Sequence, residues 1–252
     1  YAAKILRDLM TSDGDSIERP ADGPGRLLAI GDIHGCHIAF ETLLRHLAIT
    51  PNDTVVVLGD VIDRGPGTRQ VIDRLLELRE RCRFVFLLGN HEEMFLDSLS
   101  VEEVREPWMG FGGLETLMSY GEHAEETGEI PQNHVAFLKS GLDYFETEST
   151  LFVHASLEPD RSLAEQSAEW LRWAKLTKQE QPLPSGQRVI CGHTAQKSGQ
   201  VWVGDGWVCI DTFAYGGMFL TALDVGSDLV YQARQTGDFR GPITLVTSTE
   251  PV

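Results

Sequence analysis

Short apolar runs alternate with longer amphipathic stretches in the first part of the chain. The runs at 27–30, 54–58 and 83–88 have the length and bounding residues of buried strands. Between them, apolar residues recur at the spacing of one helix face: Ile38, Leu43, Leu44 and Leu47, then Val71, Ile72, Leu75 and Leu76. This alternation predicts a βαβαβ unit with a parallel sheet, because parallel neighbours need a crossover helix.

The rest of the chain divides into a helical part and a β-rich part. Residues 91–142 are mostly helical in pattern and broken by glycines and prolines, so we expect a helical excursion that covers one mouth of the domain. After it we expect a helix at about 163–175 and strands at 149–154, 188–191, 200–203, 207–211, 219–225 and 229–233. These later strands look mostly antiparallel. The predicted fold class is therefore α/β, with two sheets packed face to face and helices outside.

Composition separates a linker from one large domain. Residues 1–25 indicate an N-terminal extension or linker, because 11–25 is polar and contains several Gly and Pro. We expect residues 26–252 to form a single folded domain that contains the excursion at 91–142. No stretch approaches the roughly 20 apolar residues that span a bilayer, and no signal peptide is visible.

Charge and cysteine usage narrow the partners and the compartment. Lys and Arg number 21 against 38 Asp and Glu, for a formal net charge of −17. Such a surface repels nucleic acid and anionic lipid, so we expect neither as a partner. The four cysteines are dispersed, without a CxxC pair, which favours reduced thiols and a cytoplasmic location.

Polar side chains follow the apolar runs where the predicted strands end. Any one of them is typical of a turn or a helix cap. As a group they indicate a binding site instead, because the carboxyl ends of strands in an open α/β sheet converge on one crevice. Carboxylate oxygen and imidazole nitrogen suit Mn, Fe or Zn, and their number suits two ions. The residues at these strand ends are Asp32, His34, Asp60, Asn90, His154 and His193.

The motifs at these strand ends resemble those of the phosphoprotein phosphatase family of metallophosphoesterases. They are GDIHG, GDVIDRG, GNHE, VHA and GHT, in that order between residues 31 and 194. IDTFAYGG at 210–217 resembles the closing segment of bacterial members. The resemblance implies a metallophosphoesterase-like β-sandwich flanked by helices, in which two metal ions hold a bridging hydroxide that attacks phosphorus. It further implies that Asp32 and His34 hold the first ion, that Asp60 bridges both, and that the second is held by Asn90, His154 and His193.

Five further roles carry over from the same resemblance. His91 is similar to the general acid that protonates the leaving oxygen, and Asp63 would orient its imidazole. Arg64 would clamp the phosphoryl group, since a guanidinium offers a donor fork for two phosphate oxygens. Arg172, in a segment resembling the W-x-R of bacterial members, is the second candidate phosphate-binding arginine. Asn90 would also contact the phosphate.

These features indicate a two-metal phosphomonoesterase, most similar to the bacterial serine/threonine protein phosphatases, with Mn²⁺ as the expected metal. Its partner would be a phosphoprotein, a phosphopeptide or a small phosphorylated metabolite. The motif GNHE favours this interpretation, because the symmetrical dinucleoside tetraphosphatases typically carry GNHD instead. The alternative is a symmetrical bis(5′-nucleosyl)-tetraphosphatase, and a more remote one is a binding module that has lost catalysis. His154-Ala155-Ser156 replaces the HGG of eukaryotic members, which leaves the substrate open.

Overall fold

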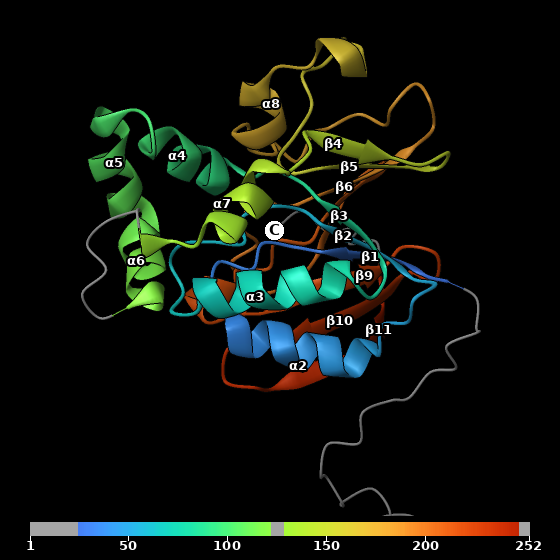
Figure 1. Cartoon of the computed structure of the whole chain (residues 1–252). Coiled ribbons are helices and arrows are strands. Elements are labelled where there is room, and N and C mark those ends of the chain that lie inside the picture. The colour runs from blue at the N-terminus through green and yellow to red at the C-terminus, as the bar shows by residue number, and fades with distance from the viewer. Residues whose placement is uncertain (1–24, 122–128, 247–252) are drawn as a thin grey trace, which may run out of the picture.

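The computed structural model describes residues 25–121 and 129–246, so the predicted extension lies almost entirely outside the described residues. Two mixed sheets form the centre of the molecule (Figure 1). The strands of the six-stranded sheet are, in order across it, β11 (Phe239–Thr244), β10 (Leu229–Ala233), β9 (Leu220–Asp224), β1 (Leu27–Ile30), β2 (Thr54–Val57) and β3 (Arg83–Phe86). Those of the five-stranded sheet are β4 (Tyr144–Glu146), β5 (Thr150–Val153), β6 (Arg188–Cys191), β8 (Trp207–Cys209) and β7 (Trp202–Val203).

The predicted βαβαβ unit is confirmed. β1, β2 and β3 pair in parallel and are joined by helices α2 (His37–Leu47) and α3 (Thr68–Arg79). Alternate residues of β1 face opposite ways: Leu28 and Ile30 join the core under these helices, and Ala29 joins the core between the sheets. This two-residue period is what a strand buried on both faces requires.

Side chains from both sheets meet in one apolar layer. Val56 of β2 and Leu223 of β9 share a buried cluster with Phe152 of β5 and Ile190 of β6. The opposite face of the second sheet packs against Leu171 of the short helix α8 (Ala168–Arg172). In Figure 1, α2 and α3 lie on one side of the sheets and α8 on the other. The expected sandwich flanked by helices is therefore confirmed.

The strand directions in the second half differ from the prediction. β9, β10 and β11 run antiparallel to their neighbours but join the first sheet, beside β1. β5, β6 and β8 are mutually parallel, so the mostly antiparallel second half was wrong for these three. β4 and β11 were not predicted, and the helix expected at 163–175 is only one 3₁₀ turn (Leu163–Glu165) and α8.

The helical excursion has the predicted character over the described residues. It comprises α4 (Asn90–Ser98), α5 (Glu102–Trp108), a π-helical turn (Met109–Gly113), α6 (Leu114–Tyr120) and α7 (Gln132–Lys139). Gly112 in the π-helical turn has φ of 114°, and a Cβ there would lie 2.5 Å from the backbone nitrogen of Arg64. Only glycine permits this approach, which places the excursion directly against the loop after β2. Among the described residues, no helix is long and apolar enough to cross a membrane.

A buried ion pair fixes the start of the domain. Asp53 is fully buried and accepts two hydrogen bonds from Arg26. Its Oδ2 accepts from Nη2 at 2.9 Å, and its Oδ1 accepts from the backbone N–H at 2.7 Å. Burial alone would raise the pKa of Asp53, but the hydrogen bonds from Arg26 and Thr50 and the charge of Arg26 hold it well below its usual range. Its ionised form therefore stabilises the fold.

Asp53→Asn should lower the free energy of unfolding at pH 7 by about 3 kcal/mol, because it leaves Arg26 without its charge partner. Since the folded pKa is lowered, the contribution of Asp53 is complete above about pH 4 and declines as the pH falls towards the folded pKa. Urea unfolding at pH 7 and pH 3 measures this, with the exposed Asp205→Asn as control. A gap between variant and native protein that is no smaller at pH 3 would contradict the assignment.

Candidate metal centre

The loops that follow β1, β2, β3, β5 and β6 bring the predicted metal ligands together. In chain order these are Asp32 and His34, Asp60, Asn90, His154 and His193. Three of them adopt left-handed backbone, with φ of 45° at His34, 48° at Asp60 and 60° at His193. Non-glycine residues in this conformation carry strain and cluster at functional sites. The strand ends thus aim side chains at one point.

Asp60 lies at the centre of this group. Its Oδ2 is 3.5 Å from Nε2 of His34, and its Oδ1 is 3.5 Å from Nε2 of His154. Two sets of candidate ligand atoms share it, one with His34 and His91 and the other with His154 and His193, and within each set the atoms lie within 4.8 Å of one another. Burial alone would raise the pKa of Asp60, but these histidines hold it well below its usual range.

Backbone carbonyls orient three imidazoles. His34 can donate from Nδ1 to the oxygen of Ile62 at 2.9 Å, and His154 from Nδ1 to Leu58 at 2.7 Å. His193 uses Nε2 instead, bonding the oxygen of Trp173 at 2.9 Å. In each ring the other nitrogen then faces the site as a lone pair. This is how metal-binding histidines are held in general.

Asn90 and Asp32 complete the donor set. The Oδ1 of Asn90 lies 3.2 Å from Nε2 of His154 and 3.0 Å from Nδ1 of His193. Both carboxyl oxygens of Asp32 accept the backbone N–H of His193, at 3.2 and 3.0 Å. Burial and the nearby carboxylates of Asp211 and Asp60 raise the pKa of Asp32 well above its usual range. Crowded buried carboxylates beside unprotonated imidazole nitrogens fit divalent cations such as Mn²⁺, Fe²⁺ or Zn²⁺.

His91 and Asp63 form a buried pair beside this centre. Nδ1 of His91 lies 2.7 Å from Oδ2 of Asp63. The indole Nε1 of Trp108 donates to both Asp63 oxygens at 3.2 and 3.1 Å, and the Thr116 hydroxyl donates to Oδ1 at 2.7 Å. Burial works to lower the pKa of His91, but the charges of Asp60 and Asp63 outweigh it and raise the pKa. With Nδ1 used by Asp63, Nε2 of His91 is left for the site.

Two residues of the excursion therefore support the pair, and sequence reasoning gave them no role. Trp108 ends α5 and Thr116 lies in α6. Both side chains are buried. No local pattern in the sequence specifies either contact.

Glu92 is a further residue whose role the sequence did not reveal. Its carboxylate accepts N–H bonds from Asp60 at 2.8 Å, Val61 at 2.8 Å, Ile62 at 3.3 Å and Gly89 at 3.0 Å. Burial and the neighbouring Asp60 raise the pKa of Glu92 to about 8. One side chain thus ties the loop after β2 to the start of α4, half of a capping box extended to a second loop.

The two predicted phosphate-binding arginines have different surroundings. Arg64 lies at the centre, with Nη1 2.8 Å from Nε2 of His34, and its guanidinium stacks under the ring of Tyr215 at 4.3 Å. Arg172 lies further out and bonds Oε1 of Glu93 at 2.5 Å and a carboxyl oxygen of Asp143. Its guanidinium is therefore already paired with two carboxylates.

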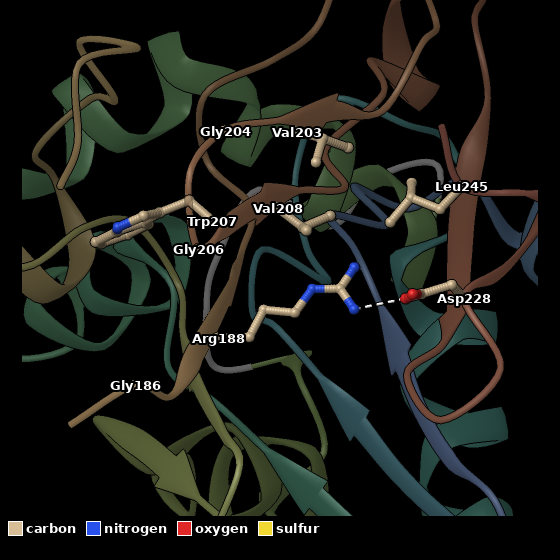
Figure 2. A pocket seen from close by; sticks show the side chains of 9 residues that line it. All are labelled: Gly186, Arg188, Val203, Gly204, Gly206, Trp207, Val208, Asp228 and Leu245. Carbon is tan, nitrogen blue, oxygen red and sulfur yellow. Dashed lines mark hydrogen bonds and ion pairs between the residues drawn. The ribbon is translucent and has the colours of Figure 1, made fainter. Parts of the chain in front are cut away.

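A cavity of about 290 Å³ lies away from these residues. Figure 2 shows Arg188 and Asp228 joined by an ion pair beside it. Arg188 begins β6, whereas His193 follows the end of the same strand. The cavity thus opens at the opposite ends of the strands from the candidate metal centre and contributes no residue to it.

Convergent carboxylates and imidazoles at the strand ends of an α/β sandwich define a class of metal-dependent hydrolases. Residues 25–205 match the model of the calcineurin-like phosphoesterase family. The chain belongs to this family. The family implies a dinuclear centre of divalent metals.

Similar solved structures share the fold of this chain, whereas the curated match covers a short segment of it. The chain is 45% identical over 67 residues to a symmetrical bis(5′-nucleosyl)-tetraphosphatase of Acidovorax ebreus (strain TPSY). This match covers 26% of this chain and 23% of that protein. A solved candidate diadenosine tetraphosphatase has a TM-score of 0.65 at 19% identity, covering 88% of this chain and 98% of its own. A serine/threonine phosphatase structure from Saccharomyces cerevisiae has a TM-score of 0.56 at 17% identity, covering 83% and 76%. The chain thus spans about a quarter of the curated relative it matches.

Proposed function

We propose that the protein is a two-metal phosphomonoesterase of the bacterial serine/threonine protein phosphatase type. The observation that carries this proposal is the His91–Asp63 pair, bonded at 2.7 Å next to the candidate metal centre. An alkoxide is a poor leaving group that needs a proton as the P–O bond breaks, so a fixed proton donor matters most for an alkyl phosphate ester. Two bound divalent ions would polarise the phosphoryl oxygens and activate the attacking water.

Side chains of the protein would then bind the phosphoryl group, transfer the proton and hold the metal ions. Arg64 and Arg172 would bind phosphoryl oxygens, with Asn90 contributing its amide. His91 would hold a proton on Nε2 and pass it to the leaving oxygen, while Asp63 fixes its tautomer and direction. The proposed metal-holding residues are Asp32, His34 and Asp60 for the first ion, and Asp60, Asn90, His154 and His193 for the second.

The second candidate is symmetrical hydrolysis of bis(5′-nucleosyl) tetraphosphates. The observation that favours it is the match of 45% identity over 67 residues to such an enzyme. The leaving group in that reaction is a nucleoside diphosphate, which is stable as an anion and needs little protonation. The elaborate support of His91 by Asp63, Trp108 and Thr116 would then contribute little, which is why we rank this candidate second.

A substrate panel with the Mn²⁺-loaded full chain tests the proposal. We expect turnover of a phosphoserine peptide and of p-nitrophenyl phosphate to exceed that of diadenosine tetraphosphate. Hydrolysis of the dinucleotide alone would overturn the first proposal in favour of the second. Inactivity on all three substrates would support a binding module instead.

Four finer points belong to the same proposal. Mn²⁺ is the proposed native metal, and a phosphoprotein or a small phosphorylated metabolite the proposed partner. Residues 26–252 are proposed as the catalytic domain, with 1–25 as an extension. The protein is proposed to act in the cytoplasm, which the four free thiols support.

The two arginines should differ in importance. Arg64→Ala is expected to raise the KM for a phosphopeptide by about 10- to 100-fold, because it removes charge-assisted hydrogen bonds to the phosphoryl group. Arg172→Ala should raise it less, because Glu93 and Asp143 already share its charge. Steady-state kinetics and inhibition by inorganic phosphate measure both effects. Arg188→Ala, paired with Asp228 far from the centre, is the matched control, and a larger effect at Arg172 than at Arg64 would contradict the ranking.

A further inference from the structure

Asp211 follows the end of β8, a strand with no predicted ligand. β8 lies next to β6, and the N–H of Ile210 continues their pairing by donating to the oxygen of Cys191 at 2.9 Å. The loop after β1 passes against the same point, since a Cβ on Gly31 would lie 2.6 Å from the oxygen of Ile210. Asp211 is thereby carried to the side of Asp32.

The carboxyl groups of Asp211 and Asp32 face each other in the interior. They are 2% and 3% exposed, and they follow the two residues, Gly31 and Ile210, whose backbones lie against each other. Oδ1 of Asp211 accepts the N–H of Phe213 at 3.1 Å. In the part of the chain that the structure describes, neither carboxyl forms an ion pair with Lys or Arg. The charge of Asp211 helps to raise the pKa of Asp32, since neighbouring buried carboxylates repel each other unless a cation or a proton compensates them.

We propose that Asp211 is a further carboxylate of the first metal site, beside Asp32, His34 and Asp60. This inference rests on the two-metal centre of the proposed function but not on its substrate. Asp211 adds negative charge where the first ion binds. It thereby raises the affinity for that ion.

The alternative is that Asp211 only stabilises a turn through its bond to Phe213. The chain offers a matched control for that role in Asp224. It is also buried, at 6% exposure, and its Oδ1 accepts the N–H of the residue two positions on, Gly226, at 3.2 Å. Asparagine keeps the acceptor oxygen and the size of either side chain and removes only the charge.

Titration of the metal-free full chain with Mn²⁺ tests the inference. Native protein and Asp224→Asn should each bind two ions per chain, and the affinities of the variant should equal those of the native protein. Asp211→Asn should bind one ion as the native protein does and the other about 10- to 100-fold more weakly. Electron paramagnetic resonance of the Mn²⁺-loaded variant should correspondingly lose the spin-coupled pair signal and keep that of isolated Mn²⁺.

Several results would overturn the proposal. If Asp211→Asn bound two ions with native affinity, Asp211 would be a turn residue only. If Asp211→Asn and Asp224→Asn bound metal equally weakly, the effect would be a general one of losing a buried charge. Thermal unfolding of the metal-free variants separates folding from binding, and Asp211→Ser, which keeps an acceptor for Phe213, replaces Asp211→Asn if that variant unfolds. Because metal binding is measured without substrate, loss of one ion in a protein inactive on phosphoserine peptides would refute the proposed function and leave this inference intact.

Discussion

Asp60→Asn should abolish phosphoester hydrolysis and release metal from both sites. The two oxygens of Asp60 face different histidines, each at 3.5 Å, so one substitution affects both sets of ligands. Loss of even an outer partner of a ligand lowers metal affinity or activity about 10- to 100-fold, and the loss of a shared ligand should exceed that range. Metal content after dialysis and turnover of p-nitrophenyl phosphate measure the two effects.

The control for this variant is Asp224→Asn, which removes a buried carboxylate from β9 outside the centre. It should keep both ions and the native rate. If Asp60→Asn retained two ions at native affinity, Asp60 would not bridge the sites, and the proposed metal centre would have to be rebuilt around other donors.

His91→Asn should slow turnover of a phosphoserine peptide by about 10²- to 10⁴-fold, the usual contribution of a general acid. The loss should be much smaller with p-nitrophenyl phosphate, because p-nitrophenolate leaves readily without a proton. Metal content should stay near two ions per chain. The comparison of the two substrates therefore isolates proton donation from every other role of the imidazole.

Asp63→Asn is the matched variant for the same step. It keeps the size of the side chain but removes the charge that accepts from Nδ1 at 2.7 Å, so it should show the same dependence on leaving group. Equal losses on both substrates would count against proton donation. Loss of an ion in His91→Asn would make His91 a ligand instead, since its ring nitrogen lies within 4.8 Å of ligand atoms of His34 and Asp60.

The strand ends could be predicted because strongly apolar runs stop at chemically distinct residues. The continuous apolar run at 27–30 and the helix spacing of 38–47 were typical of the signals that predicted the parallel unit and its crossover helices. Once parallel strands are placed side by side, their carboxyl ends must meet at one edge. Asp32, Asp60 and Asn90 therefore came together in the sequence interpretation for the same reason as in the structure.

The supporting residues could not be predicted, because their partners are distant in the chain. Thr116 bonds Asp63 across 53 positions, and Trp108 does so across 45. No local pattern marks such pairs. The helix expected at 163–175 is interrupted, because the Ser167 hydroxyl accepts the N–H of Trp170 and caps the start of α8.

The reach of the Glu92 side chain has a consequence for how the GNHE motif should be interpreted. Its carboxylate bonds N–H groups on both the loop after β2 and Gly89, at 2.8 to 3.3 Å. An aspartate at this position is one methylene shorter, so these two loops would have to approach each other or find another tether. An aspartate in place of Glu92 would therefore change the backbone spacing around Asp60.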